Sequence, residues 1–211
     1  MNEIDKNSYI ERYSDRFKVY GHDIKTLGWG GDKKRQFLRF QTALELENFI
    51  NTNQVESILD IGCGFGDMGG EFLKNNFPEI KYVGIDINPL LIKEGKVRYP
   101  ELDLRTLDIL EDDLEEKFDI VCESGIFNYK LDNEVQLKYI QNMITKMYSL
   151  ANYGVSCDFL STFVDFQHEG AYHMNEYTAL KIGKQFSKRI IIRNDYLDYE
   201  YCMYIIKEIY D

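Results

Sequence analysis

Short apolar runs alternate with amphipathic stretches along most of the chain. Apolar residues at helical spacing predict helices, and short β-branched runs bounded by turn residues predict strands. Alternating strands and helices predict an α/β fold whose mostly parallel sheet carries helices on both faces. The expected helices cover residues 9–20, 32–50, 67–76, 88–99, 132–150 and 174–186. The expected strands cover residues 57–61, 81–87, 103–107, 118–123, 154–160, 189–193 and 201–207.

The order of these elements predicts one domain over residues 1–211. The last two strands follow each other through a short loop, which favours an antiparallel pair. A chain of 211 residues has room for one α/β domain with a substantial core. We expect residues 50–211 to form this core. Residues 1–49 are expected to be a helical extension that packs on its ligand-binding side.

A glycine-rich loop follows the first predicted strand. Residues 58–69 read Ile-Leu-Asp-Ile-Gly-Cys-Gly-Phe-Gly-Asp-Met-Gly. Glycine tolerates positive φ and lets backbone approach a ligand closely, which suits Gly62, Gly64 and Gly66. Asp86 closes the next strand, where a carboxylate can accept both ribose hydroxyls. The pattern predicts a site for an adenosine-containing cofactor at the carboxyl end of a parallel sheet.

Two kinds of cofactor fit this sequence pattern: a dinucleotide, and a cofactor that carries a sulfonium and an ammonium. Residues 64–69 satisfy the G-x-G-x-x-G pattern of dinucleotide sites, which alone is weak. The pyrophosphate of a dinucleotide is anionic, so the carboxylates of Asp60 and Asp67 would repel it. The same carboxylates would attract a sulfonium and an ammonium. An NAD-binding oxidoreductase remains the alternative on the same fold. A second alternative is a protein that binds S-adenosylmethionine (SAM) without catalysis.

The D-x-G-x-G-x-G frame of residues 60–66 resembles motif I of the class I SAM-dependent methyltransferases. The resemblance implies a Rossmann-like seven-stranded sheet in the order 3-2-1-4-5-7-6 with strand seven reversed. It implies that Ile87 lies against adenine, that Asp108 accepts from the adenine amino group, and that Glu123 lies near the methionine end. SAM is then the cofactor and S-adenosylhomocysteine (SAH) the product. The expected cofactor-binding residues are Tyr20, Trp29, Arg39, Asp60, Gly62, Cys63, Gly64, Gly66, Asp67, Asp86, Ile87, Asp108, Ile109 and Glu123.

Other segments resemble a group of small bacterial methyltransferases found among surface-polysaccharide modification enzymes. These segments are residues 20–22, 27–30, 36–40, 124–128, 159–162 and 194–196. The resemblance implies that Arg39 pairs with the SAM carboxylate and that Tyr20 and Trp29 close over the cofactor. It also makes a sugar, a nucleotide-linked sugar or a phosphoramidate the expected methyl acceptor.

The expected chemistry is an in-line displacement of a methyl group from a sulfonium. A base is needed only for a hydroxyl or a protonated amine. His168 and His173 lie in a loop expected at the carboxyl edge of the sheet, so they are the first candidates, with Tyr172 lining the acceptor. His22 is a third candidate. The acidic residues and histidines of 165–173 do not have a recognised metal-ligand spacing, so no metal is expected.

Composition limits the classes of binding partner that we expect. A net charge of −11 argues against nucleic acid and against an anionic membrane surface, and favours a small-molecule acceptor. The four cysteines are widely spaced, which predicts free thiols. The chain has neither a signal-peptide pattern nor a twenty-residue apolar span, which predicts a cytoplasmic protein. A monomer or a homodimer is expected.

Overall fold

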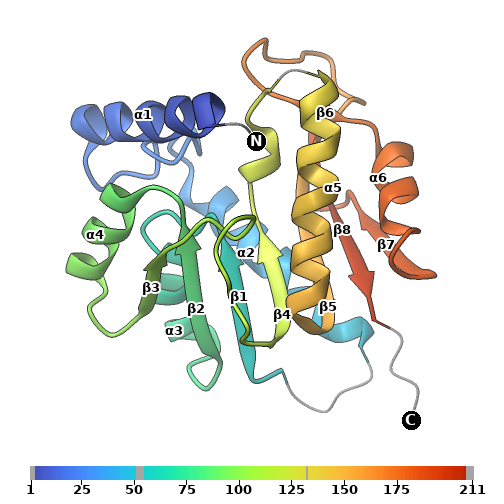
Figure 1. The fold of residues 1–211 in the computed structure, drawn as a ribbon, viewed down its shortest axis with the longest axis horizontal. Coiled ribbons are helices and arrows are strands. Elements are labelled where there is room, and N and C mark those ends of the chain that lie inside the picture. Colours follow the sequence, from blue (N-terminus) through green and yellow to red (C-terminus); the bar gives the residue numbers. More distant parts are fainter. Residues whose placement is uncertain (1–2, 51–54, 132, 208–211) are drawn as a thin grey trace.

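A computed structural model describes residues 3–50, 55–131 and 133–207, and it has one mixed sheet at its centre (Figure 1). The neighbours in the sheet follow the order β3-β2-β1-β4-β5-β8-β7, and β6 pairs with the end of β5. All pairs are parallel except those of β8, which is antiparallel to β5 and β7. The strands are β1 (Ser57–Ile61), β2 (Lys81–Asp86), β3 (Asp103–Thr106), β4 (Phe118–Glu123), β5 (Ala151–Ser161), β6 (His173–Met174), β7 (Arg189–Arg193) and β8 (Glu200–Ile206).

The expected α/β fold with a reversed last strand is confirmed, but the number of strands is not. The described residues form eight strands, so the order ends 5-8-7 rather than 5-7-6. The additional strand, β6, has two residues and pairs His173 with Leu160 and Met174 with Ser161. Two residues are too few to produce an alternating pattern, so this strand could not be predicted from the sequence.

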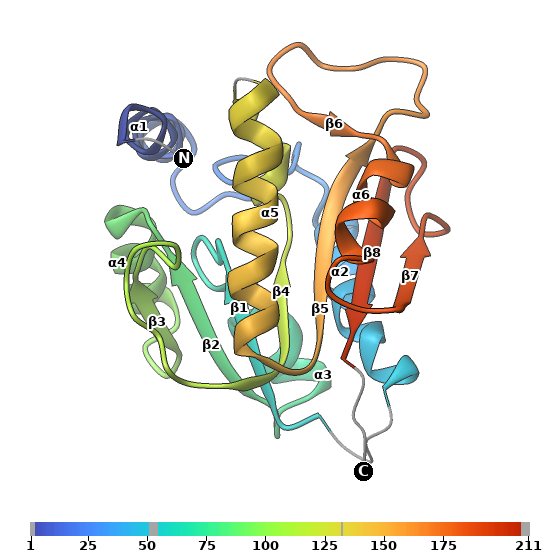
Figure 2. The ribbon, with the colours of Figure 1, turned by 45° about the vertical axis from the view of Figure 1, so that its right-hand side comes forward.

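Helices cover both faces of the sheet (Figures 1 and 2). Asp32 and Asn88 cap α2 and α4, each accepting a hydrogen bond from a backbone N–H in the first turn of its helix. The predicted helix over 32–50 ends early and continues as a 3-10 turn, and most of the one over 67–76 is a wider π turn. The helices are α1 (Glu3–Tyr20), α2 (Lys33–Leu44), α3 (Lys74–Asn76), α4 (Pro89–Arg98), α5 (Asn133–Leu150) and α6 (Glu176–Gly183), with turns at η1 (Glu45–Phe49), η2 (Met68–Leu73) and η3 (Ile126–Asn128).

Two apolar clusters form the core, one on each face of the sheet. Successive side chains of a strand point to opposite faces, so Leu59 of β1 packs toward α5 and α6 while Ile58 packs toward α2. All four cysteines are buried free thiols, as predicted. Within the described residues, no helix is long and apolar enough to cross a membrane.

The N-terminal helix α1 lies across the ends of the central strands (Figure 1). The Asn88 side-chain amide donates to the Ile10 carbonyl at 3.2 Å and to Ser14 Oγ at 3.3 Å. Ser8 Oγ lies 3.1 Å from the Tyr129 hydroxyl. These contacts hold α1 over the side of the sheet where the glycine-rich loop lies.

Candidate functional site

Two adjoining cavities open where β1, β2 and β4 end. The larger has a volume of about 370 Å³, which falls in the range of about 300–1,000 Å³ that is typical of small-molecule sites. The smaller has about 40 Å³ and is mostly apolar. Tyr9, Gly62, Asp86 and Ile126 line both, so the two form one continuous site.

The glycine-rich loop needs its glycines for conformation and for space. Gly62, Gly64 and Gly66 have φ values of 77°, 58° and 84°, a region that L side chains rarely adopt. A Cβ at Gly62 would lie 2.1 Å from Ile126 Cγ2, and one at Gly64 would lie 2.7 Å from Leu27 Cδ2. Gly62, Cys63 and Gly64 line the larger cavity. Gly66 instead lets the loop pack against Leu104 of β3.

In addition to Glu200, three buried carboxylates line the larger cavity, at the glycine-rich loop and the end of β2. Asp60 accepts from the Tyr82 hydroxyl at 2.7 Å. Asp67 accepts from the Tyr99 hydroxyl at 2.9 Å. Asp86 accepts from the backbone N–H groups of Gly64 at 3.0 Å and Asn88 at 2.8 Å, so it joins the end of β2 to the glycine loop.

Burial makes the ionised form of these carboxylates unfavourable unless a cation lies beside them. It raises the pKa of Asp60 to about 7, with Asp86 and Asp67 adding to the shift, while the Tyr82 hydrogen bond opposes it. Burial also raises the pKa of Asp86 to about 6 against three backbone hydrogen bonds. A cation in the cavity would favour the ionised forms of both groups.

We expect SAM affinity to rise with pH. Both pKa values exceed the ordinary value of about 3.9, so between about pH 4 and 7 the folded chain binds more protons than the unfolded chain, and the stability of the unliganded protein falls as the pH rises. A bound cation reverses this preference, so SAM binding releases protons and tightens between pH 5.5 and 7.5, by up to about tenfold per pH unit for each linked proton. Calorimetric titration across this range measures the effect. Asp60→Asn should flatten the profile, and a wild-type affinity independent of pH would contradict it.

The smaller cavity contains three of the residues expected to bind the cofactor. Ile87, Asp108 and Ile109 line it. Asp108 forms an ion pair with Lys6 of α1, and Lys6 Nζ also lies 2.7 Å from Glu111 Oε1. With a volume of about 40 Å³, this pocket is too small for an adenine ring, so we expect α1 to shift and Lys6 to leave Asp108 when the cofactor binds.

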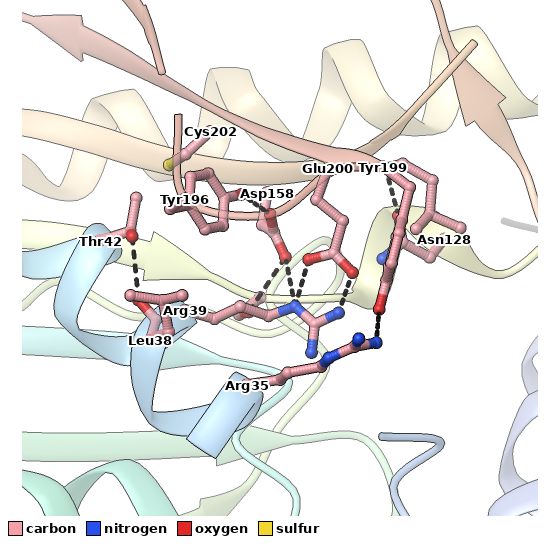
Figure 3. Close-up of polar contacts among 12 residues, drawn as sticks. Arg35, Leu38, Arg39, Thr42, Asn128, Asp158, Tyr196, Tyr199, Glu200 and Cys202 are labelled. Carbon is pink, nitrogen blue, oxygen red and sulfur yellow. Dashed lines mark hydrogen bonds and ion pairs between the residues drawn. The ribbon is translucent and has the colours of Figure 1, made fainter. Parts of the chain in front are cut away.

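Arg39, expected to bind the SAM carboxylate, is part of a buried ion-pair cluster (Figure 3). Its Nε and Nη2 donate to the two carboxylate oxygens of Glu200. Its Nε also lies 3.6 Å from Asp158 Oδ2, and Asp158 accepts from the Tyr196 hydroxyl at 2.6 Å. Arg39 lines the larger cavity. None of these contacts uses Nη1, so this nitrogen is the one that a ligand carboxylate would meet.

Trp29 lies over this cluster at the wall of the cavity. The Arg39 guanidinium carbon is 4.2 Å from the centroid of the Trp29 ring, a cation–π distance. The ring also packs on Gly125, where a Cβ would lie 3.4 Å from Trp29 Cη2.

Because Trp29 is the only tryptophan, its fluorescence reports on this wall alone. We expect SAH to change the emission on excitation at a tryptophan-selective wavelength, since the ligand carboxylate would alter the charge beside the ring. Trp29→Phe provides the blank. SAH binding detected by calorimetry without any change in emission would contradict the placement of Trp29 at the cofactor.

The structure does not bring the candidate bases to the cavity. His22 pairs with Glu94 at 3.0 Å and stacks on Phe65. His168 is exposed and accepts from the Gly170 N–H at 3.1 Å. His173 belongs to β6, which turns its Nδ1–H to the Ser161 carbonyl at 2.7 Å.

Besides Gly66, three further predicted residues lie outside the linings of both cavities. Tyr172 packs against the apolar core. Tyr20 is exposed, with Arg16 over its ring. Glu123 is fully buried and accepts from the backbone N–H groups of Ile126 at 3.2 Å and Asp158 at 2.7 Å, which orders the turn after β4. Burial, with Asp158 beside it, raises its pKa well above the usual range.

Sequence reasoning missed Gln36 as a site residue. Its side chain is fully buried, lines the larger cavity and donates to Asp67 at 3.4 Å. Its Oε1 is buried without a hydrogen-bond partner among the described residues, so it can accept from a ligand ammonium. Its position three residues before Arg39 on α2, hence on the same helix face, was the available signal. The lining also includes Tyr9, Arg12, Tyr13, Asp32, Arg35, Asn128 and Tyr199.

No metal centre is evident in the part of the chain that the structure describes. There is no group of three or more His, Cys, Asp or Glu side chains placed to hold an ion. The residues of 165–173 considered for a divalent metal therefore do not form such a group.

Comparison with known sequences shows that the part of the chain around this site is similar to methyltransferases. A family model described as a methyltransferase domain matches residues 59–154. The putative methyltransferase 235L of Invertebrate iridescent virus 6 is 29% identical over 114 residues, which are 51% of this chain and 43% of the relative. The malonyl-[acyl-carrier protein] O-methyltransferase of Acetivibrio thermocellus is 34% identical over 90 residues, 42% of this chain and 31% of the relative. The chain spans less than half the length of these relatives.

Solved structures share the fold over nearly the whole chain. Magnesium protoporphyrin IX methyltransferase from Synechocystis PCC 6803 with bound SAH has a TM-score of 0.68 at 17% identity, covering 97% of this chain and 99% of that one. The N-methyltransferase NodS from Bradyrhizobium japonicum WM9, in complex with SAH, has a TM-score of 0.62 at 18% identity, covering 92% and 95%. The expected Rossmann-like fold of the class I methyltransferases is thereby confirmed.

Proposed function

We propose that this chain is a SAM-dependent methyltransferase that acts on a small polar acceptor. The observation that carries the proposal is the continuous site between the glycine-rich loop and Asp86, lined by buried carboxylates that suit a cation. The match to a methyltransferase domain covers this same region. SAM is the cofactor, and SAH is the product.

Each part of SAM has a proposed partner in the site. Asp86 accepts from the ribose hydroxyls, and the apolar pocket around Ile87 and Ile109 holds adenine, with Asp108 at the amino group. Asp60, Asp67 and Gln36 surround the sulfonium and ammonium end, and Arg39 faces the carboxylate. The bound cofactor supplies an activated methyl group. The residues of the chain align the acceptor behind that methyl and exclude water, which is catalysis by proximity.

The proposal also assigns a role to each of two parts of the chain. Residues 50–211 form the catalytic core, and residues 1–49 form a cover that contributes α1, Trp29 and Arg39 to the site. The contacts of Lys6 with Asp108 and of Asn88 with α1 support the role of a cover. SAM entry then requires α1 to move.

The two alternatives, an NAD-binding oxidoreductase and a protein that binds SAM without catalysis, have less support. The carboxylates of Asp60 and Asp67 would repel the pyrophosphate of NAD, and none of the reported relatives is named as an oxidoreductase. A protein that only binds SAM would have no use for a cavity that continues past the cofactor residues to Arg12, Arg35 and Tyr199.

The identity of the acceptor stays a prediction. The names of the relatives differ in acceptor, from a malonyl-acyl carrier protein to magnesium protoporphyrin IX. The segments that resemble polysaccharide-modifying enzymes favour a sugar, a nucleotide-linked sugar or a phosphoramidate. The net charge of −11 favours a small molecule over a nucleic acid.

The proposal is tested by methyl transfer from labelled SAM into extracts of the source organism, separated by size. We expect label in the small-molecule fraction. Label in polymers alone would refute a small acceptor. SAM binding by calorimetry with no label in any fraction would refute methyl transfer and support the binding-only alternative.

A further inference from the structure

The larger cavity is lined by three arginines, of which only Arg39 has been assigned to SAM. Arg12 comes from α1, and Arg35 and Arg39 come from α2. Figure 3 shows Arg35 and Arg39 side by side, pointing toward Tyr199 and Glu200 of the β8 end. The same lining contains five carboxylates, at Asp32, Asp60, Asp67, Asp86 and Glu200, so the arginines are distinguished by whether a carboxylate already neutralises them.

The three arginines differ in how far they are already neutralised. Arg39 is paired with Glu200. Arg35 Nε lies 3.5 Å from Asp32 Oδ2, and its Nη1 donates to the Tyr199 hydroxyl. Arg12 has no carboxylate within ion-pair distance among the described residues, and its guanidinium lies over the Tyr129 ring at 5.5 Å from the centroid. An arginine on an aromatic face with no acidic partner is ready to bind an anion.

The same cavity offers poor means of removing a proton from an acceptor. No histidine lines it. Burial raises the pKa values of its Cys63, Tyr9 and Tyr13 side chains, which keeps them protonated.

The carboxylates of the lining are already engaged. Asp32 and Glu200 have arginine partners, and Asp60, Asp67 and Asp86 accept hydrogen bonds on the cofactor side. Asp60, whose pKa burial raises to about 7, is assigned to the cofactor and not to the acceptor, so the acceptor side of the lining suits an acceptor that needs no base.

We infer that the acceptor is a carboxylic acid and that its carboxylate is the group methylated; this rests on the proposed methyltransferase function. A lone pair of one carboxylate oxygen forms the new C–O bond as the bond from sulfur to the methyl carbon breaks. The electron pair of that bond stays on sulfur, so the sulfonium becomes the thioether of SAH and the acceptor becomes a methyl ester. No proton is transferred. A guanidinium that holds one oxygen leaves the other free to attack, and an acidic sugar would satisfy this requirement together with the expected sugar acceptor.

The chemical lability of the product tests this inference separately from the proposed function. The labelled small-molecule fraction is treated with mild alkali, which releases the methyl group of a carboxylate ester as volatile methanol and leaves methyl ethers, N-methyl groups and simple methyl phosphates intact. We expect most of the label to become volatile. Label that stays in the alkali-treated product would overturn the carboxylate acceptor and leave the methyltransferase proposal standing. The absence of label in every fraction would overturn the methyltransferase proposal itself.

Arg12 provides a second test at the level of binding. Arg12→Gln should raise the KM for the acceptor fraction at least tenfold and leave the SAH dissociation constant unchanged, with partial rescue by Arg12→Lys. Lys18→Gln is the matched control because Lys18 is exposed on the same helix and pairs with Asp15, outside the cavity lining. An Arg12→Gln enzyme with the KM of Lys18→Gln would overturn the assignment of Arg12 to the acceptor.

Discussion

Replacement of Asp86 by alanine is expected to weaken SAH binding about a hundredfold or more. A carboxylate that accepts both ribose hydroxyls contributes about 1.5–3 kcal/mol for each hydrogen bond, and a loss of 1.4 kcal/mol is a factor of ten in affinity. The substitution also removes the acceptor that holds the Gly64 and Asn88 N–H groups, so the glycine loop loses an anchor. Calorimetric titration of SAH measures the change.

The control for Asp86→Ala is a second aspartate on the same sheet. Asp103 lies at the exposed start of β3, outside both cavities. The Asp103→Ala variant should therefore leave SAH affinity unchanged. Thermal unfolding shows whether each variant is folded. A folded Asp86→Ala protein that binds SAH within threefold of wild type would contradict the assignment of Asp86 to the ribose.

Replacement of Arg39 by methionine is expected to lower the free energy of unfolding by about 3–5 kcal/mol. The guanidinium is buried, with 8% of its side chain exposed, between Glu200 and Asp158. Without it, two carboxylates remain buried with no cation beside them, and this desolvation is the source of the loss. Urea unfolding of the wild type and the variant measures it.

Two further variants separate the buried ion pair from the helix that carries it. Lys34→Met changes an exposed residue of α2 and should cost less than about 0.5 kcal/mol. Arg39→Met combined with Glu200→Leu should recover part of the loss, because it removes one of the stranded charges. If Arg39→Met is no less stable than Lys34→Met, the cluster does not contribute to stability as argued.

The sequence predicted the central strands well because their signal is local. The bounds of β1, β4 and β7 agree with the predictions, since each is a short apolar run between polar or turn residues. Local patterns do not show how two elements meet. The π turn of η2 places Gly69 and Gly70 where a Cβ would lie 2.5 Å from the Tyr82 ring and 2.3 Å from the Tyr99 ring, a fit that periodicity cannot reveal.

The meeting of the glycine loop and the β2 end was predictable, because the parallel order brings both segments to one edge of the sheet. The acceptor side was not predictable. The histidines were chosen by residue type, but His173 belongs to β6, which pairs with the end of β5, and His168 lies in the exposed loop before it. Arg12 and Arg35 are ordinary helix residues in the sequence, and only the packing of α1 and α2 over the sheet brings them to the cavity.

A crystal structure of the protein with SAH tests the central claim most directly. We predict that SAH lies in the continuous site, with its ribose hydroxyls on Asp86, its adenine between Ile87 and Ile109, and its sulfur facing the part of the cavity lined by Arg12 and Arg35. The ion pair between Lys6 and Asp108 should be broken. SAH bound elsewhere, or with its sulfur turned away from these arginines, would contradict the account.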